Sequence, residues 1–113
     1  MISVNETDSL LVAYNRMRAS DVSQIPVMNN TTLMGILDEE DLLFAVSKDQ
    51  SSFSENVSDY MMDHLDTLQF DASKDELLSI LTEGKVAIIY DGETFIGFVT
   101  KVDLINYYRN KFK

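Results

Sequence analysis

Two aspartates, Asp41 and Asp103, end similar stretches of sequence in which a glycine is followed by two apolar and three variable residues. A carboxylate in the first turn of a helix stabilises that helix by a few tenths to about 1 kcal/mol. It can also accept hydrogen bonds from ligand hydroxyl groups, because an ionised carboxylate accepts and does not donate. Thr100 precedes Asp103 by three residues, and its hydroxyl can cap the helix and still contact a ligand. Asp38 takes that place before Asp41, and at both junctions the structural and ligand-binding interpretations stay open.

Other groups that could do chemistry are few. The acidic run of residues 38–41 could attract a divalent cation, but four residues that spiral around a helix start rarely converge on one ion. A solvated acidic face explains the run better. The chain has no cysteine, which excludes thiolate sites and disulfides. It has one histidine, His64, which excludes a His-rich metal cage and leaves no second histidine to spare for a catalytic triad. We therefore expect no metal site, no enzymatic activity of this chain alone, and an ordinary surface or boundary place for His64.

The composition is that of a foldable, acidic chain. Its 113 residues, 45% of them hydrophobic, suffice for one compact domain or two very small ones. The formal charge of −10 repels phosphate backbones and anionic lipids, so we expect neither nucleic acid nor membrane as a partner. No apolar run approaches the roughly 20 residues of a membrane span, and residues 1–5 do not begin a signal peptide. Together with the absence of cysteine, this favours a cytoplasmic location.

The chain contains an internal repeat. Residues 35–43 align with residues 97–105 at an offset of 62, and residues 25–28 align with residues 87–90 at the same offset. Each of the latter segments is followed by a turn-forming pair, Asn-Asn or Asp-Gly. Further upstream, Leu10-Leu11 matches Leu77-Leu78 at an offset of 67, so the second copy is five residues shorter before its second strand. Three registered blocks make coincidence a poor explanation.

Periodicity and turn residues predict the pattern β-α-β-β-α for each copy. The expected strands are residues 2–4, 24–28 and 33–37 in the first copy and 67–70, 86–90 and 95–100 in the second. Helices begin at Asp8 or Ser9 and at Ser73 or Asp75, and Gly84 ends the latter helix. Their expected apolar faces are Leu10, Leu11, Tyr14 and Met17, and Leu77, Leu78 and Leu81. Each second helix presents an apolar face that begins at Leu42-Leu43 or Leu104-Ile105.

These elements predict a division of the chain into two repeats. The first repeat spans residues 1–47 and the second spans residues 57–113. Between them, the serine-rich residues 48–56 have the composition of a linker. A short helix is expected over residues 57–62.

Two such units, each with an apolar strand, a hairpin and a Gly-to-Asp strand-to-helix junction, resemble a pair of cystathionine-β-synthase (CBS) domains, the Bateman module. The resemblance covers essentially the whole chain and implies an α+β (α/β) fold of two CBS repeats packed sheet to sheet with pseudo-two-fold symmetry. Residues 13–18, 21–27 and 35–43 are similar to the C-terminal regulatory region of bacterial cystathionine β-synthases. Those enzymes are pyridoxal-phosphate-dependent lyases. The resemblance thus implies a regulatory fragment whose catalytic domain, with its pyridoxal phosphate, lies outside this chain.

The resemblance also implies two clefts for adenosyl ligands. In each, backbone groups of a strand in one copy read the adenine edge, and the Asp that ends the junction motif of the other copy binds the ribose hydroxyls. The expected residues of the first cleft are Val22, Ser23, Gln24, Ile25, Thr100 and Asp103, with Ile2 or Ser3 nearby. Those of the weaker second cleft are Lys85, Val86, Ala87, Ile88, Asp38 and Asp41, with Thr67 nearby.

Charge distinguishes these two clefts and the ligands they favour. The carboxylates of residues 38–41 repel a phosphate, so the Asp103 cleft is preferred. Neither cleft gathers the basic residues that ATP would need, and AMP would depend on backbone N–H groups at a helix start. S-adenosylmethionine carries a positive sulfonium and is the ligand that the resemblance suggests.

Two classes of function remain. In the first, an adenosyl compound shifts the equilibrium of an allosteric module that regulates an attached enzyme. In the second, the pair is a constitutive homodimerisation module with empty clefts. Met61, Met62, Tyr107 and Tyr108 are expected in the core or in dimer contacts.

Overall fold

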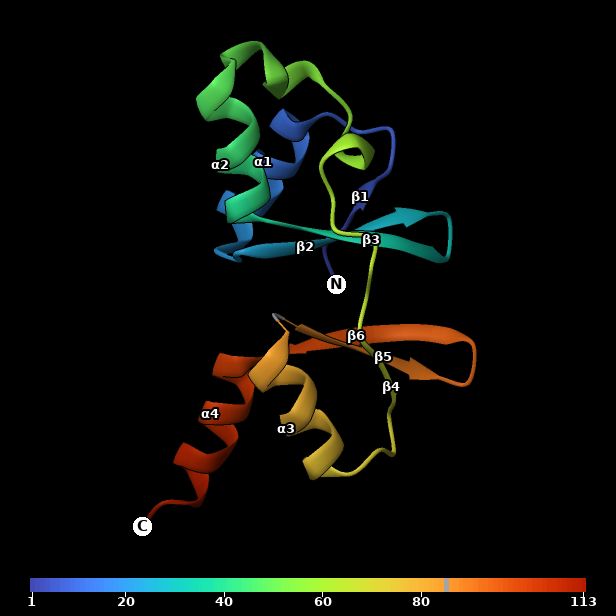
Figure 1. The fold of residues 1–113 in the computed structure, drawn as a ribbon, viewed down its shortest axis with the longest axis vertical. Helices are drawn as coiled ribbons and strands as arrows, with labels where there is room; N and C mark the ends of the chain where they lie inside the picture. The colour runs from blue at the N-terminus through green and yellow to red at the C-terminus, as the bar shows by residue number, and fades with distance from the viewer. Residues whose placement is uncertain (85) are drawn as a thin grey trace. The chain divides into compact units, whose positions relative to one another are not determined.

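The computed structural model describes residues 1–84 and 86–113, which form two compact units, Met1–His64 (unit 1) and Leu65–Lys113 (unit 2) (Figure 1). Each unit contains a three-stranded mixed sheet and two α-helices, which confirms the predicted α+β fold. Within the described residues, no helix combines the length and the apolar character needed to cross a membrane.

Unit 1 places its strands in the order β1-β2-β3, with β1 parallel and β3 antiparallel to β2. Its α-helices connect β1 to β2 and follow β3, as the repeat predicts. The elements are β1 (Val4–Asn5), α1 (Leu10–Ser20), β2 (Gln24–Asn29), β3 (Thr32–Asp38) and α2 (Glu39–Lys48).

Unit 2 repeats this topology with the strand order β4-β5-β6 and the same pattern of parallel and antiparallel pairing. Its elements are β4 (Thr67–Gln69), α3 (Lys74–Glu83), β5 (Val86–Asp91), β6 (Thr94–Thr100) and α4 (Lys101–Lys111). The hairpin turns correspond at the offset of 62, with Asn30 and Gly92 at φ angles of 54° and 61°. Both turns therefore use residues that tolerate the left-handed conformation.

Side chains cap all four helices at their N-termini. Ser9 and Ser73 accept hydrogen bonds from backbone N–H groups three residues further on, so the serine is the cap at both of the predicted helix starts. Gly84 ends α3, as predicted. At the second helices, Asp38 and Thr100 form capping boxes with Asp41 and Asp103.

In α1 and α3, fewer side chains are buried than the predicted apolar faces contain. In α1, Leu10 and Met17 are buried and Tyr14 is half-buried, whereas Leu11 is 48% exposed. In α3, Leu81 is buried but Leu78 is 43% exposed. Consecutive residues lie about 100° apart around a helix, so only one of two adjacent leucines can point into a one-sided core.

Residues 48–62 pack against the rest of unit 1, although part of this segment has the composition of a linker. Two 3₁₀ helices, η1 (Gln50–Ser54) and η2 (Val57–Asp59), lie in it, and Val57 is fully buried. Phe53 packs edge-on against Tyr14, with ring centroids 6.1 Å apart. Met62 exchanges backbone hydrogen bonds with Ile36 of β3. Residues 57–64, counted above with the second repeat, therefore pack in unit 1.

Candidate functional site

The junction of β6 and α4 in unit 2 carries the carboxylate that we expected to bind ribose. The Oδ2 atom of Asp103 accepts hydrogen bonds from the backbone N–H of Thr100 at 2.9 Å and from its hydroxyl at 3.0 Å. The Oδ1 atom accepts none from the described residues, and Asp103 is exposed. The capping bonds therefore fix the orientation of the carboxylate and leave one oxygen able to accept ligand hydroxyl groups.

The corresponding junction in unit 1 is chemically different. Asp38 is only 7% exposed, and its Oδ1 atom accepts a 2.9 Å hydrogen bond from the backbone N–H of Asp41. The carboxylate of Asp41 accepts in return from the backbone N–H of Asp38 at 3.2 Å. Two carboxylates thus occupy positions that hold one carboxylate and one hydroxyl in unit 2. This junction has the greater negative charge and would bind an anionic ligand less favourably.

Strand pairing places the start of the second strand of each unit beside the junction of that same unit. Gln24 pairs with Asp38, and the carbonyl of Ser23 accepts a 3.1 Å hydrogen bond from the backbone N–H of Glu39. In unit 2, Val86 pairs with Thr100. The first predicted cleft combines residues 22–25 with Thr100 and Asp103 and so draws on both units, and this combination stays a prediction.

The remaining predicted contacts differ in exposure. Val22 is 37% exposed, Ser23 is exposed, Gln24 is half-buried and Ile25 is fully buried, so Ile25 offers its backbone alone. Val86, Ala87 and Ile88 are buried in the same manner. Lys85, which we also placed in the second cleft, lies outside the described residues. His64 is exposed.

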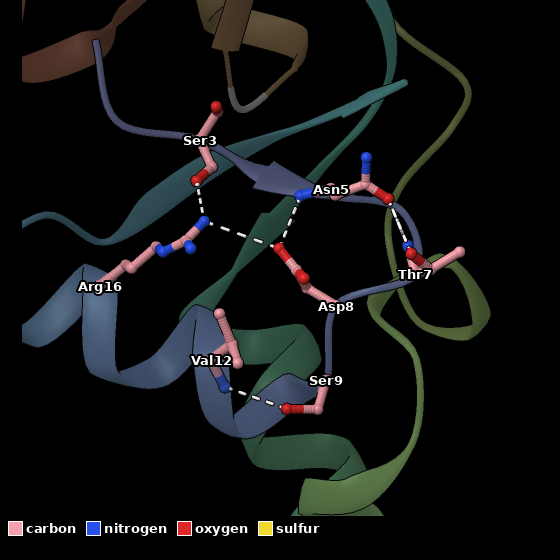
Figure 2. Close-up of polar contacts among 7 residues, drawn as sticks. All are labelled: Ser3, Asn5, Thr7, Asp8, Ser9, Val12 and Arg16. Carbon is pink, nitrogen blue, oxygen red and sulfur yellow. Dashed lines mark hydrogen bonds and ion pairs between the residues drawn. The ribbon is translucent and has the colours of Figure 1, made fainter. Parts of the chain in front are cut away.

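Arg16 is a positioning residue that the sequence analysis missed. Its Nη1 atom donates a 2.8 Å hydrogen bond to the carbonyl of Ser3 and lies 3.6 Å from Oδ2 of Asp8 (Figure 2). The same carboxylate oxygen of Asp8 accepts from the backbone N–H of Asn5 at 2.8 Å. These contacts tie the segment before β1, which includes Ser3, to α1. Asp8 precedes the N-cap of α1, so no helical spacing pairs it with Arg16 and the sequence carries no local signal for this contact.

A hollow beside Asp103 has both polar and apolar walls. Asp103 lines a hollow of about 330 Å³ together with Tyr107 and Lys74, and its other walls are Leu77, Val99 and Leu104. Across the described residues, no three His, Cys, Asp or Glu side chains are arranged to hold a metal ion. The helix-start carboxylate and strand-start backbone groups can accept and donate hydrogen bonds to a polar ligand.

Comparisons with known proteins agree with the observed repeat. The sequence model of the CBS domain matches residues 1–48 and 57–110. No protein of curated function matches the chain.

Solved structures share the fold at low sequence identity. A putative signal-transduction protein with CBS domains from Burkholderia ambifaria matches with a TM-score of 0.90 and 22% identity, covering 100% of this chain and 85% of the other. A CBS-domain-containing protein from Agrobacterium tumefaciens gives 0.87 and 20%, with coverages of 96% and 89%. A Methanocaldococcus jannaschii protein described as a putative archaeal homologue of γ-AMPK gives 0.82 and 23%, with coverages of 100% and 48%.

Proposed function

Because this chain belongs to the CBS-domain family as a tandem pair, a regulatory module, we propose that it binds an adenosyl compound and thereby modulates an attached enzyme. The proposed ligand is S-adenosylmethionine or AMP, and the proposed enzyme is a pyridoxal-phosphate-dependent cystathionine β-synthase. Backbone groups of residues 22–25 read the adenine edge, and Asp103 and Thr100 bind the ribose. CBS pairs generally bind adenosyl ligands, which supports the class of ligand.

The exposed Asp103 carboxylate is the observation that carries this proposal. Its Oδ2 atom is occupied by Thr100, so Oδ1 is presented in a fixed direction to the hydroxyls of a ligand. A hydrogen bond to a charged group contributes about 1.5–3 kcal/mol net of the bond to water that it replaces, because the charge strengthens it. In unit 1 the equivalent junction holds the carboxylates of both Asp38 and Asp41 and is more buried. We therefore propose that the unit 1 junction is the weaker of the two sites.

Electrostatics favours S-adenosylmethionine among adenosyl compounds. The chain has a formal charge of −10, and a positive sulfonium is attracted where a triphosphate is repelled. AMP has less charge to accommodate than ATP and would rely on N–H groups at a helix start. The link to cystathionine β-synthase rests on the similarity of residues 13–18, 21–27 and 35–43 to that enzyme's regulatory region.

Thermal unfolding of the chain with S-adenosylmethionine, AMP and ATP tests the proposal. Ligand that binds only the folded state stabilises it by about 2.7 kcal/mol at 100 times its Kd, so the melting temperature should rise with ligand concentration. S-adenosylmethionine or AMP should raise it, and ATP should have the smallest effect. No rise with any of the three at millimolar concentration would sink the proposal.

Matched variants identify the site. Asp103→Asn keeps an oxygen that can accept from Thr100 but loses the charge, and Asp41→Asn makes the same change at the other junction. Asp103→Asn should weaken binding by about tenfold or more, which corresponds to the loss of a charge-assisted hydrogen bond. Asp41→Asn should leave most of the ligand-induced shift. Equal effects of both variants would contradict the assignment of the site to Asp103.

A second function is favoured by the exposed apolar residues of the helices, which include Leu43, Val102 and Ile105 at 66%, 67% and 63% exposure. A constitutive homodimerisation module would bury such residues against a second copy. CBS pairs often form dimers. If the chain dimerises and no adenosyl compound shifts its melting temperature, the homodimerisation module is the correct function.

A further inference from the structure

Residues 56–62 close the core of unit 1. Val57 is fully buried, and its core cluster also contains Leu37 of β3 and Ala45 of α2, which are 0% and 3% exposed. The backbone N–H of Val57 donates a 2.9 Å hydrogen bond to the carbonyl of Asp8, which ties the segment to the start of α1. Unit 1 therefore covers this part of its core with its own chain.

The equivalent surface of unit 2 is open. At the offset of 62, Leu37 and Ala45 correspond to Val99 and Tyr107. Both of these residues line the hollow of about 330 Å³ beside Asp103. Val99 is half-buried and Tyr107 is 41% exposed. The hollow in unit 2 thus lies at residues whose counterparts in unit 1 are buried together with the covering segment.

Two corresponding glycines show the same difference. A Cβ atom at Gly35 would lie 2.6 Å from the carbonyl oxygen of Met62, because the covering segment passes close to β3 there. Gly97 holds the equivalent position in β6, and apart from its chain neighbours no atom of the described residues lies within 4 Å of its Cβ position. A glycine in a strand often marks a close approach of another backbone. Unit 1 makes this approach, and unit 2 leaves space for it.

The edge of β6 also presents backbone groups for pairing. In unit 1, Ile36 of β3 exchanges hydrogen bonds with Met62 at 2.9 and 2.8 Å. Phe98 of β6 corresponds to Ile36 in sequence and in strand register. Residues of an antiparallel pair alternate between bonding to each other and pointing outwards, so Phe98 directs its N–H and C=O away from β5. Among the described residues outside its sheet, no backbone group bonds to them.

The walls of the hollow specify the chemistry of an occupant. The apolar walls suit an aliphatic side chain, and the β6 edge suits an extended backbone. The ammonium groups of Lys74 and Lys111 lie 5.3 and 5.4 Å from the ring centroid of Tyr107, and they outnumber the one carboxylate of the walls, Asp103. Residues 53–63 contain three acidic and no basic residues. A segment of the same kind is therefore complementary to the hollow in shape and in charge.

We propose that the hollow and the adjoining β6 edge bind a short segment of a partner protein that has the chemistry of residues 56–62. Its aliphatic side chain enters the hollow, an acidic residue lies near Lys74, and an extended residue pairs with Phe98. In such strand addition the backbone hydrogen bonds give affinity and the pocket gives specificity. The inference goes beyond the proposed function, because it needs no adenosyl ligand.

A synthetic peptide of residues 53–63 tests this site, because unit 1 already holds its own copy of the segment. Added to the intact, isotopically labelled chain, the peptide should cause saturable NMR shifts at Gly97, Phe98 and Tyr107. It should also slow the amide hydrogen exchange of Phe98. The same peptide with Val57→Asp has no aliphatic side chain at that position and should bind at least about tenfold more weakly.

Two glycine variants of the chain form a matched pair. Gly97 and Gly92 both have positive φ angles, 155° and 61°, and open space at the Cβ position, so alanine strains the backbone at both. Gly97→Ala places a methyl group in the path of the peptide and should weaken binding by about tenfold. Gly92→Ala lies in the hairpin turn and should change binding by less than about twofold. If Gly97→Ala does not fold, the comparison of the two peptides decides.

Three results would overturn the proposal. The first is the absence of saturable shifts at millimolar peptide, and the second is an equal response to the Val57→Asp peptide. The third is slower exchange of Phe98 as the concentration of the chain rises without peptide, which would assign the β6 edge to a second copy. Because no adenosyl compound is present in these experiments, their failure is distinguishable from failure of the proposed ligand binding.

Discussion

The two units share one topology but differ in how deeply their residues are buried. In unit 1 a core that includes Val4, Leu10, Leu37 and Val57 is closed by η1 and η2, whereas the corresponding cluster in unit 2 is built around Leu81, Ala87 and Leu104. The junction residues follow the same trend, since Asp38 is buried and Thr100 is half-buried. The repeated pattern thus determines the order of elements, and the residues that are not repeated determine burial.

This difference separates the chemical roles of the two junctions. In unit 1, the more buried junction uses both carboxylates in its own capping box. In unit 2, Thr100 supplies the cap, and one oxygen of Asp103 remains for other acceptor contacts. We infer that the less buried repeat is the one better suited to recognise a ligand, and the more buried repeat is the one that contributes more to stability.

The largest expected effect comes from removing equivalent leucines in the two cores. Leu10 is fully buried, and Leu77, its partner at the offset of 67, is half-buried. Leu10→Ala should lower the free energy of unfolding by about 2–5 kcal/mol, because it leaves a cavity, and Leu77→Ala by about 1 kcal/mol. Denaturant unfolding monitored by circular dichroism gives both values. A larger loss for Leu77→Ala would reverse the comparison of the two cores.

A methyl group at Gly35 tests the contact that residues 61–62 make with β3. A Cβ atom there would lie 2.6 Å from the carbonyl oxygen of Met62 and 2.7 Å from the sulfur of Met61. Gly35→Ala should therefore push this segment away and cost about 1–3 kcal/mol of stability. Amide hydrogen exchange should increase at Met62, whose N–H bonds to the carbonyl of Ile36 at 2.8 Å.

The double variant Gly35→Ala, Met61→Ala is the control for Gly35→Ala alone. It removes the sulfur contact and leaves the contact with the backbone oxygen, so it should restore only part of the lost stability. Full restoration would show that side-chain crowding alone causes the loss. Unchanged exchange at Met62 would show that the bridge between Ile36 and Met62 does not depend on this close approach.

The order of elements and the helix caps could be predicted from the sequence because they depend on local signals. Ser9 and Ser73 precede apolar helical periods, and Asn30 and Gly92 occupy turns between apolar strands. Exposure was harder to predict. Adjacent apolar residues such as Leu42 and Leu43 satisfy the same helical pattern, and only the neighbouring elements decide which of them is buried.

The sequence predicts the strands and the two junctions, but it does not predict which strand start lies beside which junction within a unit. Strand register brings Gln24 beside Asp38 and Val86 beside Thr100. Contacts that join residues of different units have no local signal, which is why the partner of Asp103 rests on family resemblance. Residues 48–56 have the composition of a linker, and this composition does not reveal that the ring of Phe53 packs against Tyr14.

Two aromatic pairs of similar geometry allow that segment to be compared with unit 2. Phe53 and Tyr14 lie 6.1 Å apart at 65°, and Phe95 and Tyr90 lie 6.0 Å apart at 60°. Phe53→Leu and Phe95→Leu should each cost about 0.5–1.5 kcal/mol, because both keep apolar contact and lose the edge-on ring interaction. Hydrogen exchange should rise in residues 50–62 only for Phe53→Leu. The same rise for Phe95→Leu would mean that the segment depends on unit 2.

The smallest expected effect is the pH dependence of stability that arises from two residues of this segment, Asp49 at acid pH and Tyr60 at alkaline pH. Hydrogen bonds from the hydroxyl and the backbone N–H of Ser51, at 2.8 and 2.9 Å, lower the pKa of the Asp49 carboxyl below its ordinary value. Donation from the Tyr60 hydroxyl to Glu55 at 2.8 Å raises the pKa of Tyr60. The contribution of Asp49 to the folded state is therefore present above its ordinary pKa and is lost as pH falls through the lowered pKa.

For Tyr60 the pH dependence of stability has the opposite sign, because its pKa is raised. Its neutral form is favoured in the folded state, so its contribution is present below the ordinary pKa and is lost as pH rises through the raised pKa. NMR titration should show Ser51→Ala returning the pKa of Asp49 only part of the way, because the backbone donor at position 51 remains. A complete return would assign the whole shift to the hydroxyl. No change in the pKa of Asp49 would mean that the Ser51 hydroxyl does not contribute to the shift and that the backbone N–H accounts for it alone.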